Sequence, residues 1–215
     1  MRLSESFMEP VNPLKDICTR AMAVGQKMDL SKIHYGNTSG HCLYIKRPTN
    51  YYFFLAGLVR AENLRYILEI GTHFGGSIRS MRKGLNKRHI FSNKLVTVDV
   101  TNDNMAGLWG FPRIHKIRGN SLEKEVANKA INCFKKPIDL LYIDSIHEYD
   151  HTMANIDIYG PKLDPLYIVL DDIRQCDSMR KLWADITIKY GNRAYDASEI
   201  AIRKGAGFGI IKWRQ

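Results

Sequence analysis

From Tyr51 onward, short apolar segments alternate with longer amphipathic ones, and this alternation is the feature that most limits how the chain can fold. The apolar segments, such as LLYI at 140–143 and YIVL at 167–170, run without polar interruption, as expected of strands buried on both faces. Parallel strands need helical crossovers between them. The pattern therefore predicts an α/β fold in which helices cover both faces of a largely parallel sheet.

Seven strands and five helices are predicted after residue 50, and the sheet is expected to be Rossmann-like and doubly wound. The short sequence Gly205-Ala206-Gly207 separates the last two strands and predicts an antiparallel hairpin at the end of the mostly parallel sheet. The predicted strands are 64–70, 94–100, 113–119, 138–144, 166–172, 198–204 and 208–213. The predicted helices are 51–63, 77–87, 122–134, 147–160 and 178–191.

Residues 1–50 are less regular, and we expect them to precede a main domain that spans residues 51–215. A helix is predicted at 13–28 and is followed by a loop rich in turn-forming residues. The loop residues Tyr35, His41 and Tyr44 either fold over a bound ligand as part of a lid or pack as residues of an ordinary surface segment.

Composition narrows the class of protein. The chain has 215 residues, of which 45% are hydrophobic and 25% charged, as in an ordinary soluble globular protein. No apolar run is long enough for a membrane span, and the N-terminal residues lack the apolar core of a signal peptide. The four cysteines form no CxxC pair, so we expect reduced thiols in a cytoplasmic protein and no zinc site.

The strand that ends at Ile70 runs directly into a glycine-rich turn, GTHFGGS at 71–77, before the next helix. Glycines let the backbone approach a ligand and adopt positive φ, and the helix that follows offers free N–H groups. The spacing GxxxGG differs from the dinucleotide pattern GxGxxG, which argues against a nicotinamide-dependent dehydrogenase. By itself, the turn is equally compatible with a tight connection in any α/β protein.

Polar residues also stand at the ends of the second and third predicted strands, where open parallel sheets bind their ligands. Asp99 can accept hydrogen bonds from both hydroxyls of a ribose, or it caps a helix. Asn120 and Ser121 suit either a base edge or a helix cap. Capping is favoured for Ser121, because residues 122–125 begin a helical pattern.

Three carboxylates, Asp144, Asp171 and Asp172, follow the fourth and fifth predicted strands. Two like charges about 4 Å apart repel by about 4 kcal/mol at an effective dielectric constant near 20. Three of them therefore need a counter-charge or raised pKa values. A hard divalent cation such as Mg²⁺ meets that need, so a metal site is favoured. The alternative is that one or two of these residues cap the helices that follow.

Together these motifs resemble those of class I S-adenosylmethionine-dependent methyltransferases. LEIGTHFGGS at 68–77 resembles the first motif of that family, Asp99 matches the acidic residue that holds the cofactor ribose, and Asn120 and Ser121 fall where adenine contacts usually lie. Residues 140–173 are similar to a subgroup of small-molecule O-methyltransferases, including sugar and antibiotic-tailoring enzymes, many of them metal-dependent. The residues that match the subgroup pattern are Asp144, His147, Tyr149, Asp157, Lys162, Pro165, Asp171 and Asp172.

The resemblance implies that S-adenosylmethionine is the cofactor and that the glycine-rich turn wraps its amino-acid portion. The turn residues implied are Gly71, Thr72, Gly75 and Ser77. Glu69, just before the turn, would support it or meet the ammonium group of the cofactor.

The resemblance also implies how a hydroxyl of the acceptor would be activated. Mg²⁺ or another divalent cation, held by Asp144, Asp171 and Asp172, would lower the pKa of that hydroxyl. His147 would then remove the proton, although Asp144 could itself be the base. His147 could equally be a residue at a helix N-terminus that bonds to a carboxylate.

Two further functions stay open. The net charge of +10 is compatible with a nucleic-acid methyltransferase, although no separate RNA-binding segment is recognisable. A non-catalytic binding protein with the cofactor fold is the other, and the three retained carboxylates argue against it. The positive charge slightly favours a small acceptor that carries phosphate or carboxylate. The acceptor itself and the oligomeric state are left undetermined.

Overall fold

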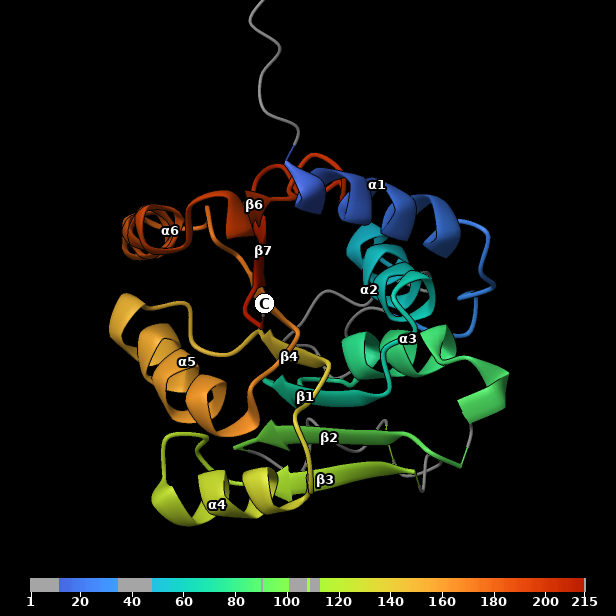
Figure 1. Cartoon of the computed structure of the whole chain (residues 1–215), viewed down its shortest axis with the longest axis horizontal. Helices are drawn as coiled ribbons and strands as arrows, with labels where there is room; N and C mark the ends of the chain where they lie inside the picture. Colours follow the sequence, from blue (N-terminus) through green and yellow to red (C-terminus); the bar gives the residue numbers. More distant parts are fainter. Residues whose placement is uncertain (1–11, 35–47, 90, 101–107, 109–112, 215) are drawn as a thin grey trace, which may run out of the picture.

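The computed structural model describes residues 12–34, 48–89, 91–100, 108 and 113–214. In these residues the chain forms one seven-stranded sheet with helices on both faces (Figure 1). The strands are β1 (Tyr66–Ile70), β2 (Lys94–Asp99), β3 (Ile114–Arg118), β4 (Leu140–Ile143), β5 (Tyr167–Asp171), β6 (Ala194–Asp196) and β7 (Phe208–Lys212). The helices are α1 (Pro13–Gly25), α2 (Asn50–Ala61), α3 (Gly76–Gly84), α4 (Lys124–Asn132), α5 (Tyr149–Leu163) and α6 (Asp177–Tyr190), with short 3-10 turns η1 (Lys87–His89) and η3 (Gly191–Arg193).

The strand order is β3-β2-β1-β4-β5-β7-β6. Strands β1 to β5 pair in parallel, whereas β7 lies antiparallel between β5 and β6. The predicted Rossmann-like sheet, mostly parallel with an antiparallel C-terminal pair, is therefore confirmed.

Two apolar cores lie on opposite faces of the sheet. Helices α1, α2 and α3 cover one face, where Phe54 of α2 packs against Phe208 of β7 with ring centroids 5.2 Å apart. Helices α4, α5 and α6 cover the other face, where Tyr159 and Trp183 pack on the strands. Because both faces are covered, the central strands β4 and β5 are apolar up to their carboxyl ends, where polar residues begin.

The position of the sixth strand is predicted wrongly. Residues 198–204 contain the apolar run Ile200-Ala201-Ile202, but they form turns, and β6 lies earlier at 194–196. The backbone N–H of Ser198 donates to Asp196 Oδ1 at 3.0 Å, and Ala201 N–H donates to Ala197 O at 2.8 Å. These local hydrogen bonds compete with strand pairing, so the segment forms turns despite its apolar residues.

The strand register brings the carboxyl ends of the parallel strands into one row. Ile70, the last residue of β1, pairs with Val98 of β2 and Ile143 of β4, and Ile143 pairs with Leu170 of β5. The residues that follow these positions are Gly71, Asp99, Asp144 and Asp171. Parallel pairing therefore collects the sequence motifs at one edge of the sheet.

No helix in the described ranges is both long enough and apolar enough to cross a membrane. The loop for which a lid function is predicted, with Tyr35 and Tyr44, lies outside the described residues. Helix α1, which precedes this loop, packs on α2 and shares its core, with Leu14 and Cys18 buried there.

Candidate active site

A cavity of about 500 Å³ lies at the carboxyl ends of the parallel strands. Residues that follow β1, β2, β3, β4 and β5 line it, together with Tyr51 of α2 and Arg203 from the segment before β7. Open α/β sheets bind ligands at this edge, and the volume suits a small molecule. The lining includes these predicted site residues: Gly71, Asp99, Asn120, Ser121, Asp144, His147, Asp171 and Asp172.

The turn after β1 requires a glycine at its first position. Gly71 has φ +93°, and a Cβ atom there would lie 1.8 Å from the backbone oxygen of Asp144. The turn is held from the neighbouring strand by Asp99, whose Oδ2 accepts hydrogen bonds from the N–H groups of Thr72 (2.9 Å) and His73 (2.8 Å). Asp99 therefore positions the turn as well as lining the cavity, and its role toward a ribose stays a prediction.

Glu69 lies beneath the turn and outside the cavity lining. Its carboxyl group is fully buried and accepts hydrogen bonds from the hydroxyls of Ser77 and Thr97. Burial raises the pKa of Glu69 to about 8, although these hydrogen bonds lower it. Thr72, Gly75 and Ser77 also lie outside the lining, with Gly75 N–H donating to Thr72 O at 2.8 Å. Glu69 thus supports the turn, which is one of the two predicted roles.

Asn120 and Ser121 line the cavity beyond β3, but the capping prediction for Ser121 is wrong. Helix α4 begins at Lys124 with Glu123 as its N-cap residue. It is Asn120 whose Oδ1 accepts the N–H of Leu122 at 3.0 Å. Ser121 is buried, and its carbonyl oxygen accepts a hydrogen bond from a tyrosine hydroxyl of α5 at 2.8 Å.

His147 lies between two of the three predicted carboxylates. Its Nε2 is 3.4 Å from Asp144 Oδ1 and 3.3 Å from Asp172 Oδ2. The other oxygen of Asp144 accepts a hydrogen bond from the Tyr142 hydroxyl at 3.0 Å. Burial lowers the pKa of His147, but the two carboxylates raise it more, so the net pKa lies above the ordinary value of 6.5. The arrangement suits a base that the carboxylates orient.

The third carboxylate pairs with an arginine that the sequence motifs do not include. Arg203 Nε donates to Asp171 Oδ1 at 2.6 Å and Arg203 Nη2 donates to Asp171 Oδ2 at 2.7 Å. The same Nη2 lies 2.7 Å from Asp172 Oδ1. Burial raises the pKa of both aspartates, and Arg203 opposes this effect. Burial lowers the pKa of Arg203, but Asp171 raises it more, so the guanidinium stays charged.

Several lining residues lie outside the predicted set, including Tyr51, His73, His151, Gln175 and Arg203. His73 and His151 stand within motifs already recognised, so their position next to a strand end is a usable signal. Arg203 has no such signal, because its segment is predicted to be a strand. The one signal in the sequence is that three carboxylates need a counter-charge, which a cationic side chain could supply.

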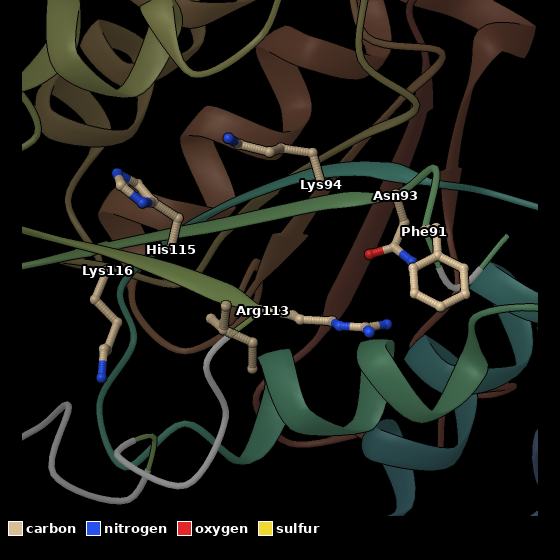
Figure 2. Close-up of a pocket in the computed structure, with 7 residues that line it drawn as sticks. Phe91, Asn93, Lys94, Arg113, His115 and Lys116 are labelled. Atoms are coloured by element: carbon tan, nitrogen blue, oxygen red, sulfur yellow. The ribbon is translucent and has the colours of Figure 1, made fainter.

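A second hollow, of about 550 Å³, lies at the opposite edge of the sheet, around the amino ends of β2 and β3 (Figure 2). Its basic lining residues, here called the basic edge, are Lys94, Arg113, His115 and Lys116. Figure 2 shows Arg113 extending toward Phe91, and its Cζ lies 4.9 Å from the centre of that ring. The described lining contains no carboxylate. This hollow is slightly larger than the cavity, but the strand ends carry no acid or base pair there.

Comparison with known proteins supports the assignment of the fold. Residues 68–173 match a family model described as a methyltransferase domain. None of the curated protein sequences matches the chain significantly.

Three solved structures illustrate the likeness. An O-methyltransferase from Bacillus cereus in complex with S-adenosylhomocysteine has 18% identity and a TM-score of 0.57, and the match covers 97% of this chain and 94% of that one. TomG, an O-methyltransferase from Streptomyces achromogenes involved in tomaymycin synthesis and bound to S-adenosylmethionine, has 14% identity, a TM-score of 0.54 and coverage of 99% and 94%.

The third structure is MycE, a methyltransferase of the mycinamycin biosynthetic pathway, in complex with Mg, S-adenosylhomocysteine and mycinamycin VI. It has 16% identity and a TM-score of 0.51, and the match covers 73% of this chain but 47% of that one. At these identities the likeness concerns the fold. The domain match, the strand order and the motifs at the strand ends agree with the fold of the class I S-adenosylmethionine-dependent methyltransferases.

Proposed function

We propose that this protein transfers a methyl group from S-adenosylmethionine to a hydroxyl oxygen of a small molecule. One observation carries the proposal: a single cavity joins the glycine turn and Asp99 to the acid–base group of Asp144 and His147. The O-methyltransferase names of TomG and of the Bacillus cereus protein support the reaction type.

The cofactor half of the cavity has the features that S-adenosylmethionine needs. The absent side chain of Gly71 lets the turn pack against the Asp144 backbone while Gly71 lines the cavity, and the turn precedes the N-terminus of α3. Asp99 would face the ribose, and Asn120 and Ser121 would face the adenine. The conformation of the turn would be held by four residues that lie outside the cavity lining, Glu69, Thr72, Gly75 and Ser77.

S-adenosylmethionine supplies a methyl group on a positively charged sulfur, and the carbon–oxygen bond to the acceptor forms as the carbon–sulfur bond breaks. The protein has to align the acceptor and take up its proton. Nε2 of His147 faces Asp144 and Asp172, so the neutral ring would carry its hydrogen there and take the proton of the acceptor on Nδ1, and the two carboxylates would then stabilise the imidazolium. Asp144 is the alternative base, and the Tyr142 hydroxyl holds one of its oxygens in place.

Magnesium is the part of the prediction that the geometry supports least. Asp144, Asp171 and Asp172 have the ligand chemistry that Mg²⁺ prefers, and MycE is named as a complex with Mg. However, a cation bound by all three would have to displace Arg203, and no cluster of metal ligands is present among the described residues. We therefore derive no step of the reaction through a metal.

The first test is calorimetric titration of the purified protein with S-adenosylhomocysteine, with NADH as the control ligand. We expect micromolar binding of the first and none of the second. Mass spectrometry of acceptor libraries incubated with S-adenosylmethionine then identifies methylated hydroxyl compounds, beginning with sugars, nucleotide sugars and phenols. The absence of binding to either ligand would contradict the proposal at its first step.

A nucleic-acid acceptor is the second candidate function, and the basic edge is the observation that favours it. Lys94, Arg113, His115 and Lys116 form a hollow with no described carboxylate, beside the exposed ring of Phe91. Such a surface suits a phosphate backbone and a stacked base. It lies near the amino end of β2, and the strand length separates it from Asp99 by about 17 Å. The test is transfer of a labelled methyl group to RNA by the wild type and by a variant with reversed charges at Lys94 and Arg113. Transfer by the wild type that is lost in the variant would favour this candidate.

A further inference from the structure

Arg203 lies where a divalent cation would have to sit to bind both aspartates at the end of β5. Three of its hydrogen bonds, at 2.6, 2.7 and 2.7 Å, reach both oxygens of Asp171 and one oxygen of Asp172. The side chain of Arg203 is 21% exposed, that of Asp171 is 1% exposed and that of Asp172 is 7% exposed. A planar guanidinium fits a carboxylate with two parallel hydrogen bonds, so the contact is specific in direction as well as in charge.

The remaining carboxylate oxygens also have protein partners. Asp172 Oδ2 lies 3.3 Å from His147 Nε2, and Asp144 Oδ1 lies 3.4 Å from the same atom. Asp144 Oδ2 accepts the Tyr142 hydroxyl at 3.0 Å. Within the described residues, each oxygen that a metal would need is thus already paired. A cation could bind only by breaking hydrogen bonds that the fold provides.

The fold holds Arg203 firmly in this position. Its guanidinium carbon lies 4.3 Å from the centre of the Tyr51 ring, a cation–π distance. Its backbone N–H donates to Ser198 O at 2.8 Å, and its carbonyl accepts Gly207 N–H at 2.7 Å. Gly207 O in turn accepts the N–H of Asp172 at 3.1 Å. The segment that carries Arg203 is therefore bonded to the end of β5 through its backbone as well as through the ion pair.

We propose that Arg203 replaces the divalent cation in this protein: it is a built-in positioning residue that neutralises Asp171 and Asp172 and makes methyl transfer independent of metal. Only the statement that methyl transfer is independent of metal rests on the proposed function. Arg203 acts through the aspartates. It keeps Asp172 in place, and Asp172, with Asp144, fixes the ring of His147.

The test is metal binding, which does not require knowledge of the acceptor. Mn²⁺ is titrated into wild-type protein, Arg203→Gln and the double variant Arg203→Gln with Asp171→Asn, and the free ion is followed by electron paramagnetic resonance. We expect no specific Mn²⁺ on the wild type. Removing the guanidinium should tighten Mn²⁺ binding by at least about a hundredfold, because a positive charge next to the site is lost and two carboxylates are exposed. The added Asp171→Asn change should abolish that gain.

Two results would overturn the inference. One is a Mn²⁺ ion bound to the wild type and lost when Asp171→Asn is made alone and titrated in the same way, because the cation would then displace Arg203. The other is a folded Arg203→Gln variant that gains no Mn²⁺ binding. Thermal melting and S-adenosylhomocysteine binding establish that each variant is folded, and if Arg203→Gln is not, Arg203→Ala with the same titration replaces it. If both are unfolded, the wild-type titration decides: absence of Mn²⁺ supports the inference.

Activity provides a separate readout once an acceptor is known. Wild-type turnover should be the same with a chelator and with added Mg²⁺, whereas Arg203→Gln should lose turnover and Arg203→Lys should recover part of it. A failure to bind S-adenosylhomocysteine would refute the proposed function and leave the Mn²⁺ result valid. Turnover that a chelator abolishes would refute the replacement of the cation and leave the methyltransferase function intact.

Discussion

The cavity at the carboxyl ends of the parallel strands and the hollow lined by the basic edge have similar volumes, about 500 and 550 Å³. They lie at opposite ends of the strands and are built in different ways. In the cavity, charged groups are buried and paired, as with Asp171 and Arg203, and the backbone is constrained, as at Gly71. At the basic edge, Arg113 is exposed, and the positive charges of Lys94, Arg113 and Lys116 stand together. Buried, paired groups in a constrained backbone are typical of catalytic sites, whereas exposed charge of one sign mainly governs solubility and long-range attraction.

The largest expected effect tests whether acid–base chemistry belongs to the cavity alone. His147→Ala should lower kcat by about 10² to 10⁴-fold, the usual contribution of a general base. His115→Ala, at the basic edge, should leave kcat unchanged, because His115 lies outside the cavity lining. Steady-state kinetics of the two variants measure both kcat values. Equal losses of kcat would show that acid–base chemistry is not confined to the cavity.

The pH dependence of the wild type sharpens the same point. A general base acts in its neutral form, and the pKa of His147 is raised above the ordinary 6.5 by Asp144 and Asp172, against the effect of burial. Activity should therefore rise with pH through a value above 6.5, and this limb should disappear in His147→Ala. A profile whose rising limb survives in the variant would assign the base to another residue, with Asp144 the first to examine.

Glu69 should make the stability of the cavity wall depend on pH. The unfolded chain loses the Glu69 proton near the ordinary pKa of 4.5, whereas the folded chain keeps it until about pH 8. Stability should therefore fall between these values, by about 1.4 kcal/mol per pH unit for one proton. Glu69→Gln should remove this fall, as thermal unfolding across the pH window will measure. The exposed Glu125 is the matched control, and curves of the same slope for Glu69→Gln and wild type would contradict the prediction.

Gly71→Ala tests the constrained backbone of the cavity. The added Cβ would meet the Asp144 carbonyl oxygen at 1.8 Å, at a φ of +93°. A left-handed conformation alone costs an L-residue about 1–2 kcal/mol, so S-adenosylhomocysteine should bind at least about tenfold more weakly. Gly205→Ala is the control, because a Cβ at Gly205 meets no atom within 4 Å. Calorimetric binding of both variants that equals the wild type would show that the turn tolerates a side chain.

The smallest effect is expected at the basic edge. Charge reversal of Lys94 and Arg113 should change turnover of a small acceptor by less than about twofold at physiological salt, because charges beyond about 8 Å are largely screened. The variant should lower any RNA affinity and reduce its salt dependence by about two counterions. A large loss of turnover on a small acceptor would show that the two hollows act as one site.

Local sequence patterns determined much of this molecule. Uninterrupted apolar runs such as YIVL specify buried strands, and parallel strands place Asp99, Asp144 and Asp171 at one edge of the sheet. The glycine at position 71 is likewise specified, since a positive φ and a close backbone contact exclude other residues. These features depend on periodicity and on the intrinsic conformational range of single residues.

The tertiary structure alone decided how the charges are paired. Strand β7 enters antiparallel between β5 and β6, and this brings the turn that carries Arg203 to the end of β5, where Asp171 lies. The short apolar run Ile200-Ala201-Ile202 even predicts a strand for that turn, whereas Asp196 and Ser198 form local hydrogen bonds that favour turns. The sequence thus specified three carboxylates that need a counter-charge, but only the order of the strands determined that an arginine, distant along the chain, supplies it.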